Sequence, residues 1–120
     1  MKIKTSELTG KALDYAVALA QGWKKMADYN GYSTPNGVVI APEYIPSWDW
    51  SQCGELIEKH HVELIFNSVS EEWSAYIFSF EELESVLEDG ESPTIAICRA
   101  VVAAQLGDEV DIPDELVEGV

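Results

Sequence analysis

Residues 46–54, PSWDWSQCG, hold the side chains best suited to binding a ligand, because Trp48 and Trp50 flank Asp49. In an extended segment, alternate side chains project to the same side, so both indoles face one way and the carboxylate the other. Two indoles in this arrangement can stack a flat ligand while Asp49 hydrogen-bonds to its edge. The same residues fit a simpler arrangement, in which both tryptophans enter the core and Asp49 caps the following helix beside Ser51.

Arg99 is the only arginine of the chain, and it lies in a helical pattern that is otherwise almost entirely apolar. Between Ile95 and Leu106, Gln105 is the only other polar residue. A helix that is apolar all round is buried or shared with a partner. A buried guanidinium needs compensation, so we expect Arg99 to meet an acidic side chain, a row of carbonyl groups or an anionic ligand. The planar fork of arginine suits phosphate and carboxylate groups.

Two further residues extend this candidate site. Gly54 permits a close approach of the backbone to a ligand, and Trp73 begins a strand-like segment from which its indole could join the aromatic wall. The candidate ligand-binding residues are therefore Trp48, Asp49, Trp50, Ser51, Gly54, Trp73 and Arg99.

No set of residues in the sequence points to catalysis. Glycine-rich phosphate loops, HExxH, DxDxDG and GxSxG motifs are missing. Cys53 and Cys98 lack the spacing of metal ligands, and in a reducing compartment we expect free thiols. The tandem histidines, His60 and His61, point to different faces and do not favour a Cys–His nucleophile. We expect no metal, no cofactor and a protein that is more readily explained as a binder than as an enzyme.

The charge is strongly acidic and unevenly distributed. Residues 1–60 carry six lysines and seven acids, whereas residues 61–120 carry fifteen acids and one base, within a formal net charge of -15. A phosphate backbone would repel such a half, so we expect no direct binding to nucleic acid. An acidic surface that keeps the protein soluble explains the pattern, and so does an acidic face that docks on a basic protein.

The length of 120 residues and the normal apolar content predict one globular domain. No apolar stretch approaches the roughly 18 residues that span a bilayer, and no apolar stretch follows the charged start as in a signal peptide. We expect an α+β domain over residues 1–107, an acidic and partly ordered tail over 108–120, no membrane association and a cytoplasmic location.

Caps and periodicity predict the elements of this domain. We expect a helix after Thr9 that ends near Gly22, a loop over 27–37, a strand over 38–41 and a short helix capped by Ser51. Strand-like segments follow at 62–67 and 73–79. A capping box predicts a helix over 79–90, and a long helix follows Ser92 and ends at Gly107. The expected architecture is a small antiparallel sheet of about three strands, packed with two main helices and one or two short ones.

Four blocks of the sequence resemble the NinX-like family of small bacteriophage proteins. The blocks are MKIKTSELTGKALDYAVALAQG, WSQCGELIE, EEWSAYIF and SPTIAICRAVVAAQLGDEVDIPDEL, in the family's order and spacing along nearly the whole chain. The middle block of that family usually reads DW.QGGPIIE; here Cys53 replaces its first glycine and Glu55 its proline. The resemblance implies a phage accessory protein that works inside an infected bacterium, in the host cytoplasm, and implies no reaction.

Two functions fit these residues. The first is binding and sequestration of a small anionic, nucleotide-like ligand to counter a host defence, with an aromatic wall for the base and a cation for phosphate. A homo-oligomer with ligand sites near the last helix would suit this function. The second is an acidic inhibitor or adapter that docks on a basic host protein, with exposed tryptophans as anchors.

Overall fold

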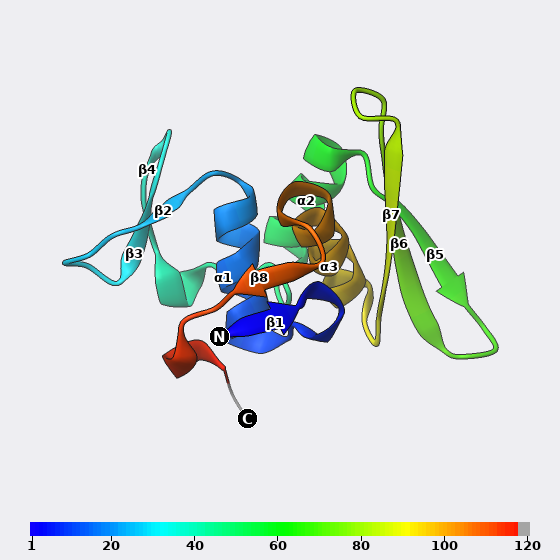
Figure 1. Ribbon diagram of the computed structural model, residues 1–120, viewed down its shortest axis with the longest axis horizontal. Coiled ribbons are helices and arrows are strands. Elements are labelled where there is room, and N and C mark those ends of the chain that lie inside the picture. Colours follow the sequence, from blue (N-terminus) through cyan, green and yellow to red (C-terminus); the bar gives the residue numbers. More distant parts are fainter. Residues whose placement is uncertain (118–120) are drawn as a thin grey trace.

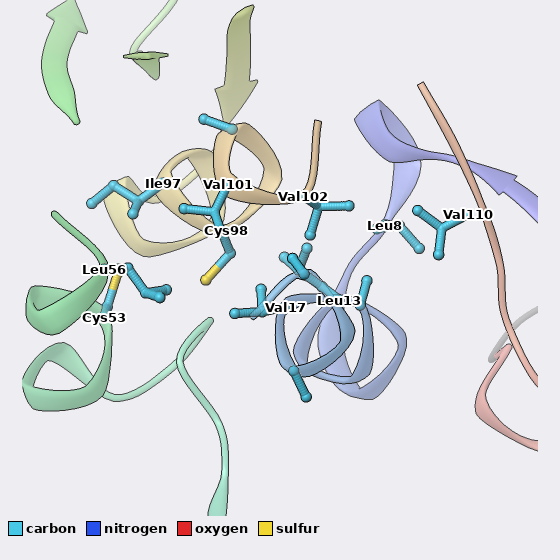
Figure 2. Packing of buried hydrophobic residues seen from close by; sticks show 14 of the residues in the cluster. Leu8, Leu13, Val17, Cys53, Leu56, Ile97, Cys98, Val101, Val102 and Val110 are labelled. Carbon is cyan, nitrogen blue, oxygen red and sulfur yellow. The ribbon is translucent and has the colours of Figure 1, made fainter. Parts of the chain in front are cut away.

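The apolar helix near the C-terminus is the centre of the fold. The computed structural model describes residues 1–117, and in it α3 spans Pro93–Leu106. The Ser92 hydroxyl accepts from the Ile95 N–H, Pro93 occupies the first turn, and Gly107 follows the last residue, as predicted. Two other helices pack on it, α1 over Gly10–Ala20 and α2 over Trp50–His60. Figure 2 shows side chains of α3 pointing toward both.

The third neighbour of α3 is an antiparallel sheet with the order β5-β6-β7. Its strands are β5 over Glu63–Asn67, β6 over Glu72–Ser79 and β7 over Glu84–Gly90. The sheet meets the helix closely where β7 ends, since a Cβ atom on Gly90 would lie 2.6 Å from the Ala96 backbone nitrogen. The centre of α3, from Ala96 to Val102, is buried except for Arg99. Its apolar sequence is therefore explained by burial within its own chain.

Two smaller sheets complete the structure (Figure 1). On the far side of α1 lie β2 over Lys24–Lys25, β3 over Gly31–Thr34 and β4 over Gly37–Ile40, in that order. Near the termini, β1 over Lys2–Lys4 pairs with β8 over Glu109–Asp111. Short 3-10 helices cover Thr5–Glu7 (η1), Ala41–Glu43 (η2) and Asp114–Leu116 (η3). Within the expected tail, β8 is thus paired and Ile112 is fully buried, while residues 118–120 lie outside the described part.

The α+β class predicted from the sequence is confirmed, with the strands divided among three small sheets. No helix within residues 1–117 has both the length and the apolar character needed to cross a membrane.

Three local predictions are wrong. The expected helix over 79–90 is replaced by the end of β6, a turn over 80–83 and strand β7, because Leu83 adopts the left-handed conformation (φ 57°) and the following residues pair with β6. The expected loop over 27–37 contains β3, which forms a hairpin with β4. The cap of α2 is Asp49, and Ser51 lies one residue inside the helix.

Candidate functional site

Asp49 is the N-cap of α2. Its carboxylate oxygen Oδ1 accepts from the Ser51 N–H at 2.8 Å, from the Ser51 hydroxyl at 2.6 Å and from the Gln52 N–H at 3.4 Å. These hydrogen bonds favour the charged carboxylate and hold the pKa of Asp49 below its ordinary value. Asp49 therefore has the helix-capping role that the sequence allowed as an alternative to ligand contact.

The three candidate tryptophans do not form one wall. Trp48 and Trp50 stand beside the start of α2 with 80% and 54% of their surface exposed. Trp73 comes from β6, where its ring packs against Phe66 at a centroid distance of 4.9 Å. Gly54 lies in α2, and a Cβ atom built on it meets no other group within 4 Å. What the fold brings together here is the first turn of α2, with its two exposed indoles.

Arg99 meets carbonyl groups, one of the three kinds of partner expected. Its Nε donates to the Leu8 carbonyl at 2.9 Å and its NH1 nitrogen to the Asp89 carbonyl at 2.8 Å. Burial lowers the pKa of the guanidinium, and the nearby acids, Glu88 first, act in the opposite direction. Arg99 thus connects α3 to the segment before α1 and to the end of β7.

The surroundings of Arg99 are unsuited to an anion. The surface hollow beside it is lined by Ser6, Thr9, Glu72, Leu87, Glu88, Asp89, Gly90 and Glu91. Four of these residues are acids, and neither Trp48 nor Trp50 is among them. A phosphate group would meet more negative than positive charge in this hollow.

A different cavity has the composition of a ligand site. It lies between α1 and the β2-β3-β4 sheet and holds about 270 Å³, just below the range of about 300–1,000 Å³ for small-molecule pockets. We call it the tyrosine pocket, and its lining residues are Lys11, Asp14, Tyr15, Lys25, Asn30, Tyr32, Ala41, Pro42, Tyr44, Ile45 and Leu116.

Aromatic rings from three distant segments form the walls of the tyrosine pocket. Tyr15 comes from α1, Tyr32 from β3, and Tyr44 follows η2. The ring of Tyr32 lies 6.5 Å from Tyr15 and 6.4 Å from Tyr44, measured between centroids. Trp23 packs behind them, 4.7 Å from Tyr44. The rings brace one another at distances typical of tilted aromatic pairs, so the wall is preformed.

These phenols are neutral at neutral pH, and burial stabilises the neutral form further. It raises the pKa of Tyr32 to about 12, and it raises the pKa values of Tyr15 and Tyr44 as well. The Tyr44 hydroxyl accepts a hydrogen bond from Gln21 Nε2 at 2.5 Å, which fixes the ring. Neutral tyrosines add no negative charge to the pocket. Tyr32 and Tyr44 are 4% and 8% exposed, so the partly exposed Tyr15 is the ring best placed to meet a ligand.

Cationic groups border the pocket. Lys11 and Lys25 are exposed lining residues, and Lys25 Nζ donates to the backbone carbonyls of Met26 and Tyr29 at 3.3 and 3.1 Å. These bonds hold one ammonium group at the rim. Two of the seven basic side chains of this acidic protein thus stand beside the aromatic wall.

Asp14 is the one acid of the lining. It is 6% exposed, and its Oδ1 accepts from the Ser47 N–H at 2.9 Å. Burial raises the pKa of this carboxyl, and the bond from Ser47 partly opposes the rise. Asp14 ties α1 to the segment before α2 and so closes the pocket on its inner side.

No local pattern in the sequence indicates the tyrosine pocket, because its residues are scattered from Lys11 to Leu116. One signal was present: six of the seven basic residues fall within residues 1–60, together with four of the five tyrosines. Trp48 and Trp50 are near neighbours in the sequence and therefore indicate a candidate site directly. The tyrosines become neighbours only when β3 and η2 fold against α1.

Comparisons with known proteins place the chain in a family. The family model described as "Bacteriophage P22, NinX" matches residues 4–105. A solved structure, titled as the crystal structure of a phage protein from Bacillus cereus ATCC 14579, has a similar fold with a TM-score of 0.61. That likeness covers 81% of this chain and 87% of the other at 12% sequence identity, so it concerns the fold alone. No curated protein matches. The chain belongs to the bacteriophage P22 NinX family, as its sequence blocks indicated.

Proposed function

We propose that this member of the P22 NinX family is a non-enzymatic phage accessory protein that binds a small, planar, anionic ligand of the nucleotide type in the tyrosine pocket. Sequestration of such a ligand would withdraw a signal on which a host defence depends. The observation that carries the proposal is the pairing of a braced tyrosine wall with two of the chain's few cations.

The two halves of the pocket suit the two halves of a nucleotide. A purine or pyrimidine ring stacks on tyrosine because both are flat and polarisable. A phosphate group is attracted to the ammonium groups of Lys11, which is exposed, and of Lys25, which two backbone carbonyls hold at the rim. With a net charge of -15, the protein as a whole repels anions. An anionic ligand therefore needs a local cationic site of this kind.

The chemistry of the lining favours binding over catalysis. The tyrosine hydroxyls have raised pKa values and are poor bases and nucleophiles at neutral pH. The carboxylate of Asp14 is engaged by the Ser47 N–H. None of the residues that line the pocket is a histidine, cysteine or serine, so the commonest pairs of nucleophile and base are missing from it.

Thermal unfolding with a panel of nucleotides tests the proposal. The panel contains linear and cyclic adenosine and guanosine phosphates, with the parent nucleosides and inorganic phosphate as controls. A ligand at a hundred times its dissociation constant adds about 2.7 kcal/mol to the free energy of unfolding, which corresponds to a rise of about 10 °C in a domain of this size. No shift with any nucleotide at millimolar concentration contradicts the proposal.

Neighbouring lysines on β2 provide a matched control for the site. Lys25 lines the pocket, whereas Lys24 is also exposed and does not line it. Lys25→Ala should weaken binding of a phosphorylated ligand by about tenfold, and Lys24→Ala should change it less than twofold. An equal loss of affinity in both variants would mean that only the general charge of the region attracts the ligand, and would contradict binding in the pocket.

A further inference from the structure

The outer face of the β5-β6-β7 sheet carries exposed apolar side chains that no described part of the chain covers. In Figure 1 this sheet forms one end of the molecule, with α3 on one side and no labelled element on the other. Strand alternation places Ile65, Tyr76, Phe78 and Leu87 on the side away from the helix. Of these, Ile65 and Leu87 are 55% and 59% exposed.

The pairing register places these side chains next to one another across the three strands. Tyr76 on β6 is paired with Leu87 on β7. On β5, Tyr76 is paired with Glu63, and Ile65 lies two residues further on the same face, diagonal to Tyr76. Phe78 follows on β6, and the ring of Phe80 stands edge-on against it at a centroid distance of 4.8 Å. Phe80 is 83% exposed. We call this set, Ile65, Tyr76, Phe78, Phe80 and Leu87, the sheet patch. Contiguous exposed apolar side chains of this kind mark interaction surfaces.

The charge around the sheet patch indicates which kind of partner can bind to it. Residues 62–91, which contain the whole sheet and its turns, carry nine acids and no lysine, arginine or histidine. Three of the acids share the outer face, where Glu63 pairs with Tyr76, Asn67 with Glu72 and Ser74 with Asp89. A second copy of the chain would bring two such acidic rims together, which costs several kcal/mol in like-charge repulsion.

We propose that the sheet patch is a docking surface for a basic protein that presents apolar side chains at the centre of a ring of lysine or arginine. An apolar centre with a charged rim is the usual anatomy of a protein interface. This surface is separate from the tyrosine pocket and shares no residue with it. The proposed surface lies in the acidic half of the chain, residues 61–120. The proposal does not depend on the ligand proposed for the tyrosine pocket.

A defined peptide tests the chemistry of this surface. The probe is a labelled 14-residue amphipathic helix built of leucine and lysine, compared with a peptide of equal charge in which serine replaces leucine. The intact protein should bind the leucine peptide, bind the serine peptide at least tenfold more weakly, and lose affinity as sodium chloride is raised from 50 to 500 mM. Equal binding of both peptides, or no binding of either at 100 μM, overturns the proposal.

Matched double variants locate the binding. Ile65→Thr with Leu87→Thr removes apolar surface from the sheet patch and keeps strand-forming residues. Val38→Thr with Ile40→Thr makes the same kind of change on β4, where the side chains are 55% and 40% exposed. The first pair should weaken binding of the leucine peptide by about tenfold or more, and the second pair by less than twofold. Equal effects of the two pairs overturn the proposal.

Two further measurements complete the test. Hydrogen exchange of the unaltered protein should slow in residues 63–67 and 85–89 when the leucine peptide is added, which locates the binding even if a variant folds poorly; protection confined to other segments counts against the sheet patch. Light scattering at 50 and 500 mM salt reports self-association. A dimer that Ile65→Thr with Leu87→Thr abolishes would identify the occupant as a second copy and refute the basic partner.

Discussion

Replacing Arg99 with methionine removes the guanidinium and keeps most of the apolar stem in α3. In the structure this group donates to the carbonyls of Leu8 and Asp89, at 2.9 and 2.8 Å. The two bonds hold the segment before α1 and the end of β7 on the central helix. Both carbonyls lose their donor in the variant, and neither gains a new one from methionine. We therefore expect Arg99→Met to lower the stability of the fold and to leave ligand binding unchanged.

The size of the loss follows from the two bonds. A hydrogen bond from a charged donor contributes about 1.5–3 kcal/mol. Arg99 is only partly buried, so the lower value applies to each bond. Together they give about 3 kcal/mol, which corresponds to a fall of about 12 °C in the melting temperature. Arg99→Lys keeps the charge among the acids but lacks the planar fork that reaches both carbonyls, so it should recover about half of the loss.

Calorimetric or circular-dichroism melting of the three proteins measures this series, and the nucleotide panel measures binding in parallel. The stability order should be Arg99, then Lys, then Met, with ligand affinity equal in all three below their melting temperatures. If Arg99→Met melts within 2 °C of the unaltered protein while the ligand-induced shift disappears, Arg99 contacts the ligand and the structural role argued for it is refuted.

Three other substitutions follow from the same structure. Asp49→Ala removes the cap of α2 and should lower the melting temperature by a few degrees while ligand affinity stays the same; a loss of binding without a loss of stability would contradict this. Asp14→Asn keeps an acceptor for the Ser47 N–H but removes a buried charge, so at pH 7 it should match or exceed the stability of the unaltered protein and bind an anionic ligand more tightly. Gly90→Ala should cost about 2 kcal/mol in a melt, since its Cβ atom would lie 2.6 Å from the Ala96 nitrogen; a neutral result would mean that β7 and α3 can separate freely.

The pH dependence of Asp14→Asn has a definite sign. Burial raises the pKa of the Asp14 carboxyl in the folded state above its unfolded value. The folded state therefore binds the proton more readily, and stability falls as the pH rises from the ordinary aspartate pKa through the raised one. The advantage of the asparagine variant should accordingly be largest at neutral pH and shrink as the solution is acidified. A pH-independent difference in unfolding free energy would exclude this mechanism.

Local signals in the sequence predict those elements whose ends are marked by caps. α1 follows Thr9 and ends before Gly22, and α3 lies between Ser92 and Gly107, as predicted. For residues 79–90 the capping box predicted a helix, and this prediction was wrong. The Ser79 hydroxyl does accept from the Glu82 N–H, at 3.3 Å, so the capping contact exists. It closes a turn rather than a helix, because pairing with β6 continues through Val86 to Gly90.

The candidate site illustrates what local signals miss. The sequence places Trp48, Asp49 and Trp50 side by side, and the structure assigns them to the start of a helix, with Asp49 as its cap. The residues of the tyrosine pocket come from α1, β2, β3 and the segments beside η2 and η3. Their proximity depends on how a small hairpin folds against α1. That arrangement is set by tertiary packing, which no spacing along the chain reveals.

Fluorine NMR of the protein labelled with 3-fluorotyrosine tests the central claim most directly. The chain has five tyrosines, of which Tyr15, Tyr32 and Tyr44 line the pocket and Tyr76 lies on the distant sheet. Titration with the nucleotide that gives the largest thermal shift should move the three pocket resonances together and leave that of Tyr76 in place. Unchanged pocket resonances at saturating ligand, with the indole N–H signals of Trp48 and Trp50 shifting in a parallel 1H–15N spectrum, would contradict the account and place the site at the start of α2.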